Sequence, residues 1–523
     1  MNTSVGLLKA FSRYSLGVAF SRISGMVRDI ALAAIFGTSP QIALFMMAYR
    51  FSNLLRRLLA EGPLSSSFVP HYQTLHYQNP HQGLLFFKDA LFLFTLFGIA
   101  ASGACMAALE ISRRALSYTP DSDEICRLTI VMFPSLVFLV IYGISSAFLQ
   151  CHRRFFLPAI APIAFNAIWI LFALVCYLKK PKSPMVWMGW GVVIAFAFQS
   201  LIPLWASLKH LRNRSSFKEI FFSKIDKHRL TKLLKPFFCG TLGVATTQLN
   251  AALDSFFAFR SDPSGPAYLW YAIRIEQVPV ALFAVALTAP LLSLISEKLQ
   301  KNQPSELALL LKEACSKMII FMSLSMWALL SLGPLGLNLV FGRGEFTFAS
   351  LVGTYQCLAF YALGILPHGI SLLYTNALYA KQEFVAGVKI SFYTVALHIL
   401  MNVLFVHVLD FSSFSVALST SISSAFQMFL LKRAFFKSYG LKIFSLKKAA
   451  LYLGFGVISA LASWTSVIYF LKTLYFKNQL LDSSDALLAS AVAGLVFLIT
   501  YVLCEKMGRE KDLYEMVKKI TRG

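Results

Sequence analysis

The sequence predicts an all-α polytopic membrane protein with about 14 transmembrane helices, built as two pseudo-repeated six-helix lobes followed by two C-terminal helices. Two observations set the class and a third sets the architecture. Of 523 residues, 57% are hydrophobic and 14% are charged, and the mean hydropathy is +0.66. A soluble domain needs a more polar surface than this composition provides. Apolar runs of bilayer-spanning length recur from end to end, and the two halves of the chain share weak matches.

Fourteen hydrophobic segments follow one another along the chain. They lie at 12–37, 41–68, 84–112, 126–150, 156–178, 185–208, 236–258, 266–296, 310–341, 349–378, 384–408, 413–436, 447–472 and 484–504. Each is close to the roughly 20 residues that cross a bilayer. The first segment does not read as a cleaved signal peptide, because its apolar part contains two arginines and is followed by the poor cleavage site "IFGTSPQ".

Lysine and arginine alternate between the two sides of this series of segments. They are dense in the connection 209–235 and in the tail 506–523, whereas "GTSPQ" and "DFSSF" contain none. Only "KKPKSP" opposes the pattern. The positive-inside rule therefore predicts that both termini are cytoplasmic. On this interpretation the net charge of +24 reflects topology and contact with anionic lipids, and no nucleic-acid-binding module accompanies it.

Weak internal matches indicate a repeat. "AYRF" at 48–51 recurs as "AIRI" at 272–275, and Asp29 matches Asp254 at nearly the same offset. Two homologous halves joined by a long linker are typical of transporters, although chance similarity between Leu- and Phe-rich helices is the alternative. The predicted divisions are an N-lobe at 1–208 (helices 1–6), a basic cytoplasmic linker at 209–235, a C-lobe at 236–436 (helices 7–12), helices 13 and 14 at 437–505, and a cytoplasmic tail at 506–523.

Charged residues inside the first apolar segment need a physical reason. An Arg or Asp at the centre of a membrane helix costs about 2.5–3.5 kcal/mol on insertion scales, so it has to face protein, water or ligand. Arg22 and Asp29 are seven residues apart and share a helix face, whereas Arg28 lies on another side. One face can therefore form an internal ion pair while another arginine lines a cavity.

The second segment repeats this pattern. Arg50 and Arg57 are seven residues apart, Arg56 lies one position further around, and Glu61 can pair with Arg57 across four residues. The alternative is that Arg56, Arg57 and Glu61 extend to the cytoplasmic interface and leave only their apolar stems in the membrane.

Several arginines at bilayer depth favour a phosphate or diphosphate ligand, because guanidinium stays charged and grips phosphate through a fork of donors. We expect Arg22, Arg28, Arg56 and Arg274 to bind it; a structural salt bridge is the alternative for Arg22, Arg28 and Arg274. A second set is expected to support the site by ion pairing, namely Asp29, Arg50, Arg57, Glu61, Asp254, Arg260 and Glu276. In that set Asp254 is expected to pair with Arg260, and Glu276 to turn toward the helix backbone.

Five runs together resemble a known family. They are "SRISGMVRDIALAAIFG", "NLLRRLLAEGPLSSSFVP", "YAIRIEQVPVALFAVAL", "FGRGEFT" and "YALGILPHGISLLYTNALYAKQE". In order and spacing they resemble the MurJ (MviN) family of bacterial lipid II flippases, within the wider group of multidrug, oligosaccharidyl-lipid and polysaccharide exporters. The resemblance spans nearly the whole chain, and its N-terminal block is the most specific part.

The resemblance implies a transporter of the bacterial cytoplasmic (inner) membrane that moves lipid II to the outer leaflet by alternating access. Arg22, Arg28, Arg56 and Arg274 match arginines of the family's basic cavity. Arg343 lies in the outer "FxRGxF" motif, where a periplasmic gate is expected. Lipid II, membrane lipids and the cell-wall synthesis machinery are the implied partners. No cofactor is expected, and the membrane potential or an ion gradient would drive transport, with the coupling ion left open.

The chain also departs from the family pattern. Ala43 stands where an acidic residue is common, Ser52 replaces a proline, and Gln356 stands in place of an arginine. Other functions stay open on the residues alone. The chain could flip another polyprenyl-linked glycan, export drugs by cation coupling, or serve as an inactive scaffold. A membrane glycosyltransferase is disfavoured, since the outer loops leave no room for a catalytic domain.

Histidines and cysteines carry little chemistry on their spacing. His71, His76 and His81 are five residues apart, which does not set ligands on one helix face, so a cytoplasmic loop is expected there and no metal site. His398 and His407 could relay protons, but buried, satisfied histidines are the plainer interpretation. The eight cysteines lack metal-site spacing and are expected to be free thiols.

Overall fold

Every regular element that the structure describes is a helix. The computed structural model describes residues 3–59, 63–212, 237, 248, 250–476 and 479–507. Within these ranges ten helices are long and apolar enough to cross a membrane, and a bent pair brings the number to as many as eleven. The predicted all-helical membrane fold is therefore confirmed.

The chain folds as two compact units. Unit 1 comprises residues 1–35 and 41–252, and unit 2 comprises residues 36–40 and 253–523. The chain thus passes into unit 2 for five residues between its first two helices and then returns to unit 1. The predicted basic linker lies outside the described residues from 213 onward, and so does the predicted tail from 508 onward.

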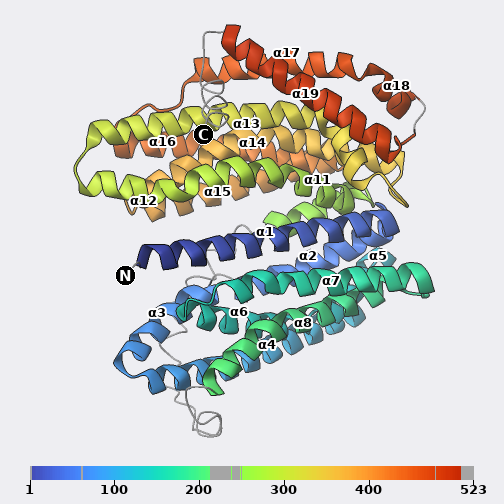
Figure 1. Ribbon diagram of the computed structural model, residues 1–523. Helices are drawn as coiled ribbons and strands as arrows, with labels where there is room; N and C mark the ends of the chain where they lie inside the picture. Colours follow the sequence, from blue (N-terminus) through green and yellow to red (C-terminus); the bar gives the residue numbers. More distant parts are fainter. Residues whose placement is uncertain are drawn as a thin grey trace. The chain divides into compact units, whose positions relative to one another are not determined.

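Unit 1 contains eight helices in the described part of the chain. They are α1 (Thr3–Phe36), α2 (Pro40–Leu59), α3 (Pro63–Gln78), α4 (Pro80–Ala115), α5 (Pro120–Met132), α6 (Ser135–Cys151), α7 (Phe156–Lys179) and α8 (Pro184–Arg212). α8 packs along both α7 and α6, and α6 packs against α4 (Figure 1). α5 and α6 meet at a bend of 42°. Pro134 occupies the break, where it cannot donate a helix hydrogen bond.

The predicted loop around His71 is wrong, because residues 63–78 form α3. The helix is held by aromatic packing. The ring of Phe68 stacks on Phe86 of α4 with centroids 5.4 Å apart, and the ring of Tyr72 meets Phe148 of α6 at the same distance. Tyr72 also hydrogen-bonds His152 through its hydroxyl, at 2.8 Å from Nε2.

Unit 2 begins with a helical stretch at 251–261, whose first two residues belong to unit 1. The elements that follow are α11 (Gly265–Pro279), η1 (Val280–Val285), α12 (Ala286–Gln300), α13 (Pro304–Phe341), α14 (Phe348–Ala380), α15 (Phe384–Val403), η2 (Leu404–Val408), α16 (Phe414–Tyr439), α17 (Leu446–Ser466), α18 (Ile468–Phe476) and α19 (Ser483–Met507). η1 and η2 are π-helical segments.

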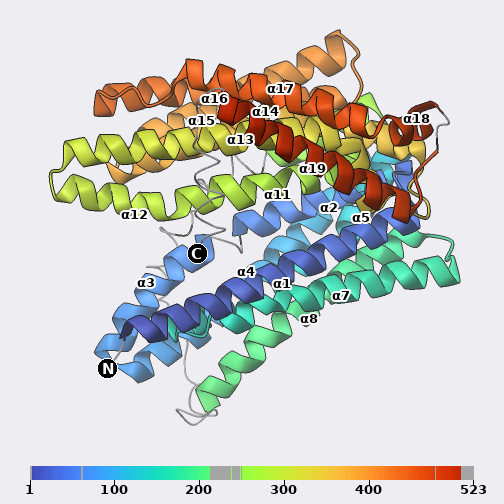
Figure 2. The same cartoon turned by 45° about the horizontal axis from the view of Figure 1, so that its top comes forward.

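α14 is the central helix of unit 2 and packs against α11, α13 and α16. α17 and α19 pack on each other and on α13, which Figure 2 shows on one side of the unit. α19 illustrates how the sequence sets these faces. Its protein-facing residues follow helical spacing and are Ala486, Ala489, Ala493 and Phe497. Leucines cover its exposed side, as expected of a helix that faces lipid.

Candidate functional site

Arg28 and Asp29 form a buried ion pair in the C-terminal third of α1. The Arg28 guanidinium donates to Asp29 Oδ1 from Nε at 3.0 Å and from Nη2 at 2.8 Å. It also donates from Nη1 to Asn166 Oδ1 of α7, at 3.1 Å. The two charged residues are 7% and 1% exposed. Three of the five N–H donors of this arginine are therefore engaged by the protein.

The ring of Trp169 completes the environment of Arg28. Its centroid lies 4.5 Å from the guanidinium carbon, within the range of a cation–π interaction. Asn166 is itself held by α1, because its Nδ2 donates to Ser24 Oγ at 2.8 Å. Sequence reasoning missed Asn166 and Trp169; the one available signal was a polar Asn within the apolar run "IAFNAIWI".

Arg22 is exposed on α1, so the expectation that it pairs with Asp29 along one helix face is wrong. Asp29 pairs instead with its neighbour Arg28. Arg22 makes no ion pair within the described residues, and the apolar side chains around it on α1 are exposed as well, namely Phe20, Ile23 and Val27. Arg22 thus offers an unengaged guanidinium beside an apolar surface, about 9 Å along the helix from Arg28 at the usual rise per residue.

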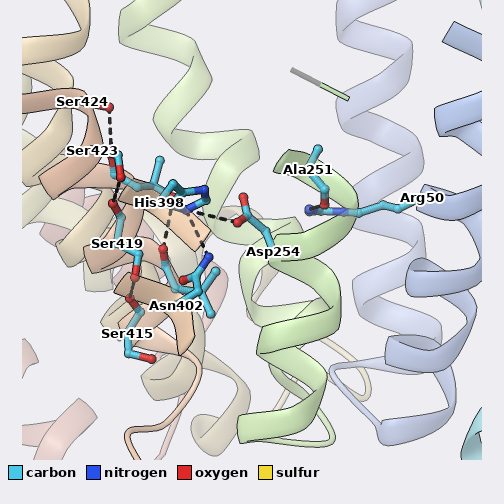
Figure 3. A network of polar contacts seen from close by, with 11 residues as sticks. Arg50, Ala251, Asp254, His398, Asn402, Ser415, Ser419, Ser423 and Ser424 are labelled. Atoms are coloured by element: carbon cyan, nitrogen blue, oxygen red, sulfur yellow. Dashed lines mark hydrogen bonds and ion pairs between the residues drawn. The ribbon is translucent and has the colours of Figure 1, made fainter. Parts of the chain in front are cut away.

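α2 carries the next group of arginines. Arg50 is half-buried, and its Nη1 donates to the carbonyl oxygen of Ala251 at 3.2 Å (Figure 3). Arg56 and Arg57 belong to α2, but their side chains lie outside the described part, as does Glu61 entirely. The Ala43 departure is fully buried in the same helix.

Arg274 is half-buried on α11, and its guanidinium carbon lies 4.7 Å from the ring centroid of Trp270. Trp270 is one helical turn before it, so the aromatic face and the cation come from the same side of the helix. Glu276 is half-buried. The expected hydrogen bond between its carboxyl group and the helix backbone is absent among the described residues. α11 therefore presents one cation and one carboxyl group two residues apart.

Asp254 does not pair with Arg260, contrary to expectation. Arg260 is exposed and makes no ion pair within the described ranges. Asp254 is buried, and its Oδ1 lies 3.3 Å from His398 Nε2 of α15 (Figure 3). The same nitrogen lies 3.3 Å from Asn402 Nδ2 and 3.4 Å from Thr420 Oγ1 of α16. Polar groups from three helical segments thus meet at one imidazole, with Asp254 and Asn402 buried and Thr420 half-buried.

The loop after α13 contains Arg343, which is exposed and donates from Nη2 to the carbonyl oxygen of Leu339 at 2.8 Å. This loop packs on the turn at residues 36–40. Gly37 has φ +58°, and a Cβ built on it would lie 2.3 Å from the carbonyl oxygen of Glu345. Tyr271 donates to the Gly37 carbonyl oxygen, and Thr38 donates to Ser350. The turn therefore belongs to unit 2 through both packing and hydrogen bonds.

Two other features bear on chemistry. Lys88 and Asp89 of α4 form a buried ion pair at 2.9 Å. The seven cysteines in the described ranges are free thiols, and those ranges hold no group of His, Cys, Asp and Glu side chains that could bind a metal ion.

Cations thus lie within apolar helices of both units, with Arg28 buried in unit 1 and Arg274 half-buried in unit 2, and comparison with known proteins gives them a context. A family model described as "Lipid II flippase MurJ" matches residues 32–489. The chain belongs to the MurJ family. The probable lipid II flippase MurJ of Chlamydia muridarum is 27% identical, with 81% of this chain and 78% of the relative covered. The Helicobacter pylori relative is also 27% identical, over 84% of this chain and 94% of the relative.

Solved structures support the same fold. A lipid II flippase MurJ in an inward closed conformation matches with a TM-score of 0.74 and 22% identity, covering 94% of this chain and 98% of that one. An inward-facing multidrug resistance MATE transporter of the MOP superfamily matches with a TM-score of 0.65 and 12% identity, covering 82% and 98%. The MurJ-family chain is therefore a transporter and not an enzyme, and it is a multi-pass protein of the bacterial inner membrane.

Proposed function

We propose that this MurJ-family protein flips lipid II from the inner to the outer leaflet of the cytoplasmic membrane by alternating access. The observation that carries the proposal is the presence of arginines within long apolar helices of both units, with Arg28 buried in α1 and Arg274 half-buried in α11. A binding site for a cationic drug would require negatively charged side chains instead. A diphosphate headgroup satisfies guanidinium at depth, where each charge is costly without a partner.

The diphosphate site is proposed to comprise Arg22, Arg28, Arg56 and Arg274. Arg22 is the strongest candidate for direct contact, because its guanidinium is exposed and makes no ion pair within the described residues. Arg28 has two N–H donors left after its bonds to Asp29 and Asn166. It is proposed to contribute these donors and its charge while fixing α1 against α7. Arg343 is proposed to act at a periplasmic gate, away from the headgroup.

The topology is proposed to comprise fourteen spans with both termini cytoplasmic. The helices that complete this number are α1, α2 and the segment that contains residues 251–261. Two six-helix lobes followed by α17 and α19 then account for the chain. The basic linker at 209–235 and the tail at 506–523 are proposed to lie at the cytoplasmic surface, as the positive-inside rule requires.

The proposed driving force is the membrane potential or an ion gradient. An inward-negative potential favours the return of a vacated cationic cavity by about 2.3 kcal/mol per charge per 100 mV. Contact with the cell-wall synthesis machinery is also proposed, because lipid II delivered to the outer leaflet has to be consumed there.

The test is depletion of the protein in its native cell, followed by identification of the polyprenyl-linked precursor that accumulates on the cytoplasmic leaflet. Lipid II is expected. Accumulation of a different polyprenyl-linked glycan would assign the flippase to that substrate, and an unchanged precursor pool would point to a scaffold role.

A further inference from the structure

The connection between α7 and α8 carries a cluster of cations that the positive-inside rule does not explain. Lys179, Lys180 and Lys182, the hairpin lysines, are exposed at the closed end of this helical hairpin (Figure 1). They form no ion pair within the described residues. In the proposed topology this end of unit 1 faces outward, where lysines are normally scarce. Three cations at this position therefore have to serve something other than the orientation of the protein.

Cations of the neighbouring connection, between α4 and α5, are neutralised by the protein itself. Both connections lie at the same end of unit 1, because α5 and α8 begin there and pack against each other (Figure 1). Three ion pairs hold the arginines of that connection, namely Arg113–Asp123 at 3.1 Å, Arg114–Glu110 at 2.8 Å and Arg127–Glu124 at 3.6 Å. Among the described residues none of these acids pairs with a hairpin lysine. The hairpin lysines thus keep their charge available for a ligand.

Exposed aromatic and apolar side chains flank the hairpin lysines on both helices. Tyr177 and Leu178 precede them at the end of α7, and Trp187 and Trp190 follow them at the start of α8. Tyrosine and tryptophan collect at the boundary between lipid and water, at the level of the lipid headgroups. The three ammonium groups are therefore held where the phosphate of a lipid lies.

The backbone of the connection is closed and fixes the position of the cluster. Lys180 ends α7 in a left-handed conformation with φ +42°, and its N–H donates to the carbonyl oxygen of Cys176 at 3.0 Å. The Cys176 thiol in turn donates to the carbonyl oxygen of Pro184, at 3.6 Å. The end of α7 and the start of α8 are thus tied together, so the hairpin lysines stay grouped on one short turn.

α7 also connects this cluster to the buried arginine of unit 1. Asn166 and Trp169 of α7 hold Arg28 through a hydrogen bond of 3.1 Å and a cation–π contact of 4.5 Å. Lys180 follows Trp169 at a distance of roughly 16 Å along the helix, at the usual rise per residue. One helix therefore borders a cation at depth and carries three cations at the surface.

We propose that the hairpin lysines form an outer binding site for the diphosphate of a polyprenyl-linked headgroup, which receives the headgroup as it leaves the interior arginines. The inference rests on the proposed flippase function and adds a second phosphate-binding position to it. Lysine binds phosphate as a point charge, without the forked geometry of arginine. Exposed ion pairs are weak, which suits a position from which the product has to be released.

Bulk phospholipid is the competing ligand, because phosphatidylglycerol also carries a phosphate. Other outer connections border the same lipids, yet "GTSPQ" and "DFSSF" contain no lysine or arginine. Contact with bulk lipid thus does not require lysines on this side. A diphosphate carries two adjacent negative charges, so it gains more from grouped cations than a single phosphate does.

The first measurement identifies the ligand of the connection. In the full-length protein, p-benzoylphenylalanine would replace Ser183, which is exposed beside the hairpin lysines. The protein would be irradiated in phosphatidylcholine nanodiscs that contain lipid II, and a crosslink to lipid II is expected. Polyprenyl monophosphate is expected to crosslink far less. A molar excess of phosphatidylglycerol is expected to leave the crosslink to lipid II in place.

A triple variant, Lys179→Gln with Lys180→Asn and Lys182→Gln, removes the charge and keeps the turn, because asparagine tolerates the left-handed conformation. It is expected to unfold at the wild-type temperature. Its binding of lipid II at this position is expected to be roughly ten- to a hundredfold weaker, from the attraction that each lysine contributes near a charged lipid surface. An arginine variant, with all three lysines replaced by arginine, is expected to keep the crosslink.

Two controls separate this site from a general effect of charge. Lys209 is exposed over the ring of Trp205 at the other end of α8, so Lys209→Gln removes a similar cation and is expected to leave the crosslink unchanged. The Debye length falls from about 8 Å at 0.15 M salt to about 3 Å at 1 M. The wild-type crosslink is therefore expected to weaken as salt is added.

The second measurement is lipid II transport in phosphatidylcholine proteoliposomes. The triple variant is expected to transport several-fold more slowly than the wild type, because the headgroup leaves the interior without the outer cations. The arginine variant and Lys209→Gln are expected to transport at the wild-type rate.

The outcomes separate this inference from the proposed function. The inference is wrong if the triple variant crosslinks or transports lipid II as the wild type does, or if polyprenyl monophosphate or phosphatidylglycerol takes the place of lipid II in the crosslink. Transport of lipid II by the wild type then still supports the flippase function. If lipid II crosslinks as expected but no condition moves it across the membrane, the outer site stands and the flippase function is wrong.

Discussion

Arg28 and Arg22 are expected to fail in different ways when truncated to alanine. Arg28 makes three hydrogen bonds to Asp29 and Asn166 and lies over the ring of Trp169. Removing one member of a buried, hydrogen-bonded ion pair costs about 3–5 kcal/mol. Arg22 is exposed and makes no such bonds among the described residues, so its truncation should change stability by no more than about 0.5 kcal/mol.

The assay is thermal unfolding of the purified protein in detergent, followed by the fluorescence of its seven tryptophans. For a unit of about 250 residues, each kcal/mol corresponds to roughly 2–4 °C, so Arg28→Ala should unfold roughly 6–20 °C below the wild type. Arg28→Lys should unfold at a temperature between those of Arg28→Ala and the wild type, because lysine keeps the positive charge but lacks the forked donor geometry of the guanidinium group. Arg22→Ala should unfold with the wild type.

Lipid II binding separates the roles further. Arg22→Ala should lose roughly ten- to a hundredfold in affinity while remaining folded, the value of one charge-assisted hydrogen bond. The reasoning is refuted if Arg28→Ala is as stable as the wild type, or if Arg22→Ala binds and transports lipid II normally.

Three further outcomes are expected. Gly37→Ala should destabilise the protein by about 1–3 kcal/mol, because Gly37 has a left-handed backbone conformation and no space for a Cβ atom. Gly440 is the control: it has φ +67° and open space around it, so Gly440→Ala should cost only about 1 kcal/mol. Equal losses of stability in the two variants would contradict the packing argument. A reporter fused after Gly523 should be active only as a cytoplasmic fusion, and periplasmic activity would mean a miscounted span. Electrophoretic mobility should be the same with and without reductant, since the described cysteines are free; a shift traced to an intramolecular bond would disprove this.

Composition and segment length were sufficient to predict helices and the membrane, because those properties depend on the sum of many residues. The partners of individual charged side chains were harder to predict. The helical-face argument joined Arg22 to Asp29, but a guanidinium on a long stem bends back to its neighbour, and Asn166 reaches it from 138 residues away in sequence. His398 was noted as buried, yet its contact with Asp254 depends on how α15 packs, which periodicity does not encode.

α3 was missed for a related reason. Its polar run resembles a loop and contains Pro70, so local preference gave no helix. The rings of Phe68 and Tyr72, packed on α4 and α6, supply the stability that the local sequence lacks. The bend between α5 and α6, by contrast, has a signal in the sequence, because Pro134 lies within a long apolar run and a proline there indicates a break in the helix.

The excursion of residues 36–40 into unit 2 limits how the protein can move. The chain crosses between the units at three places, 35/36, 40/41 and 252/253. Two of these crossings are only five residues apart and are clamped by Gly37, Thr38 and Tyr271. Two units that are joined by the chain at three places, two of them five residues apart, can rotate against each other in few independent ways. Any rearrangement of one unit against the other must therefore change backbone torsion angles at the end of α1, at the start of α2 and at the beginning of the 251–261 helix.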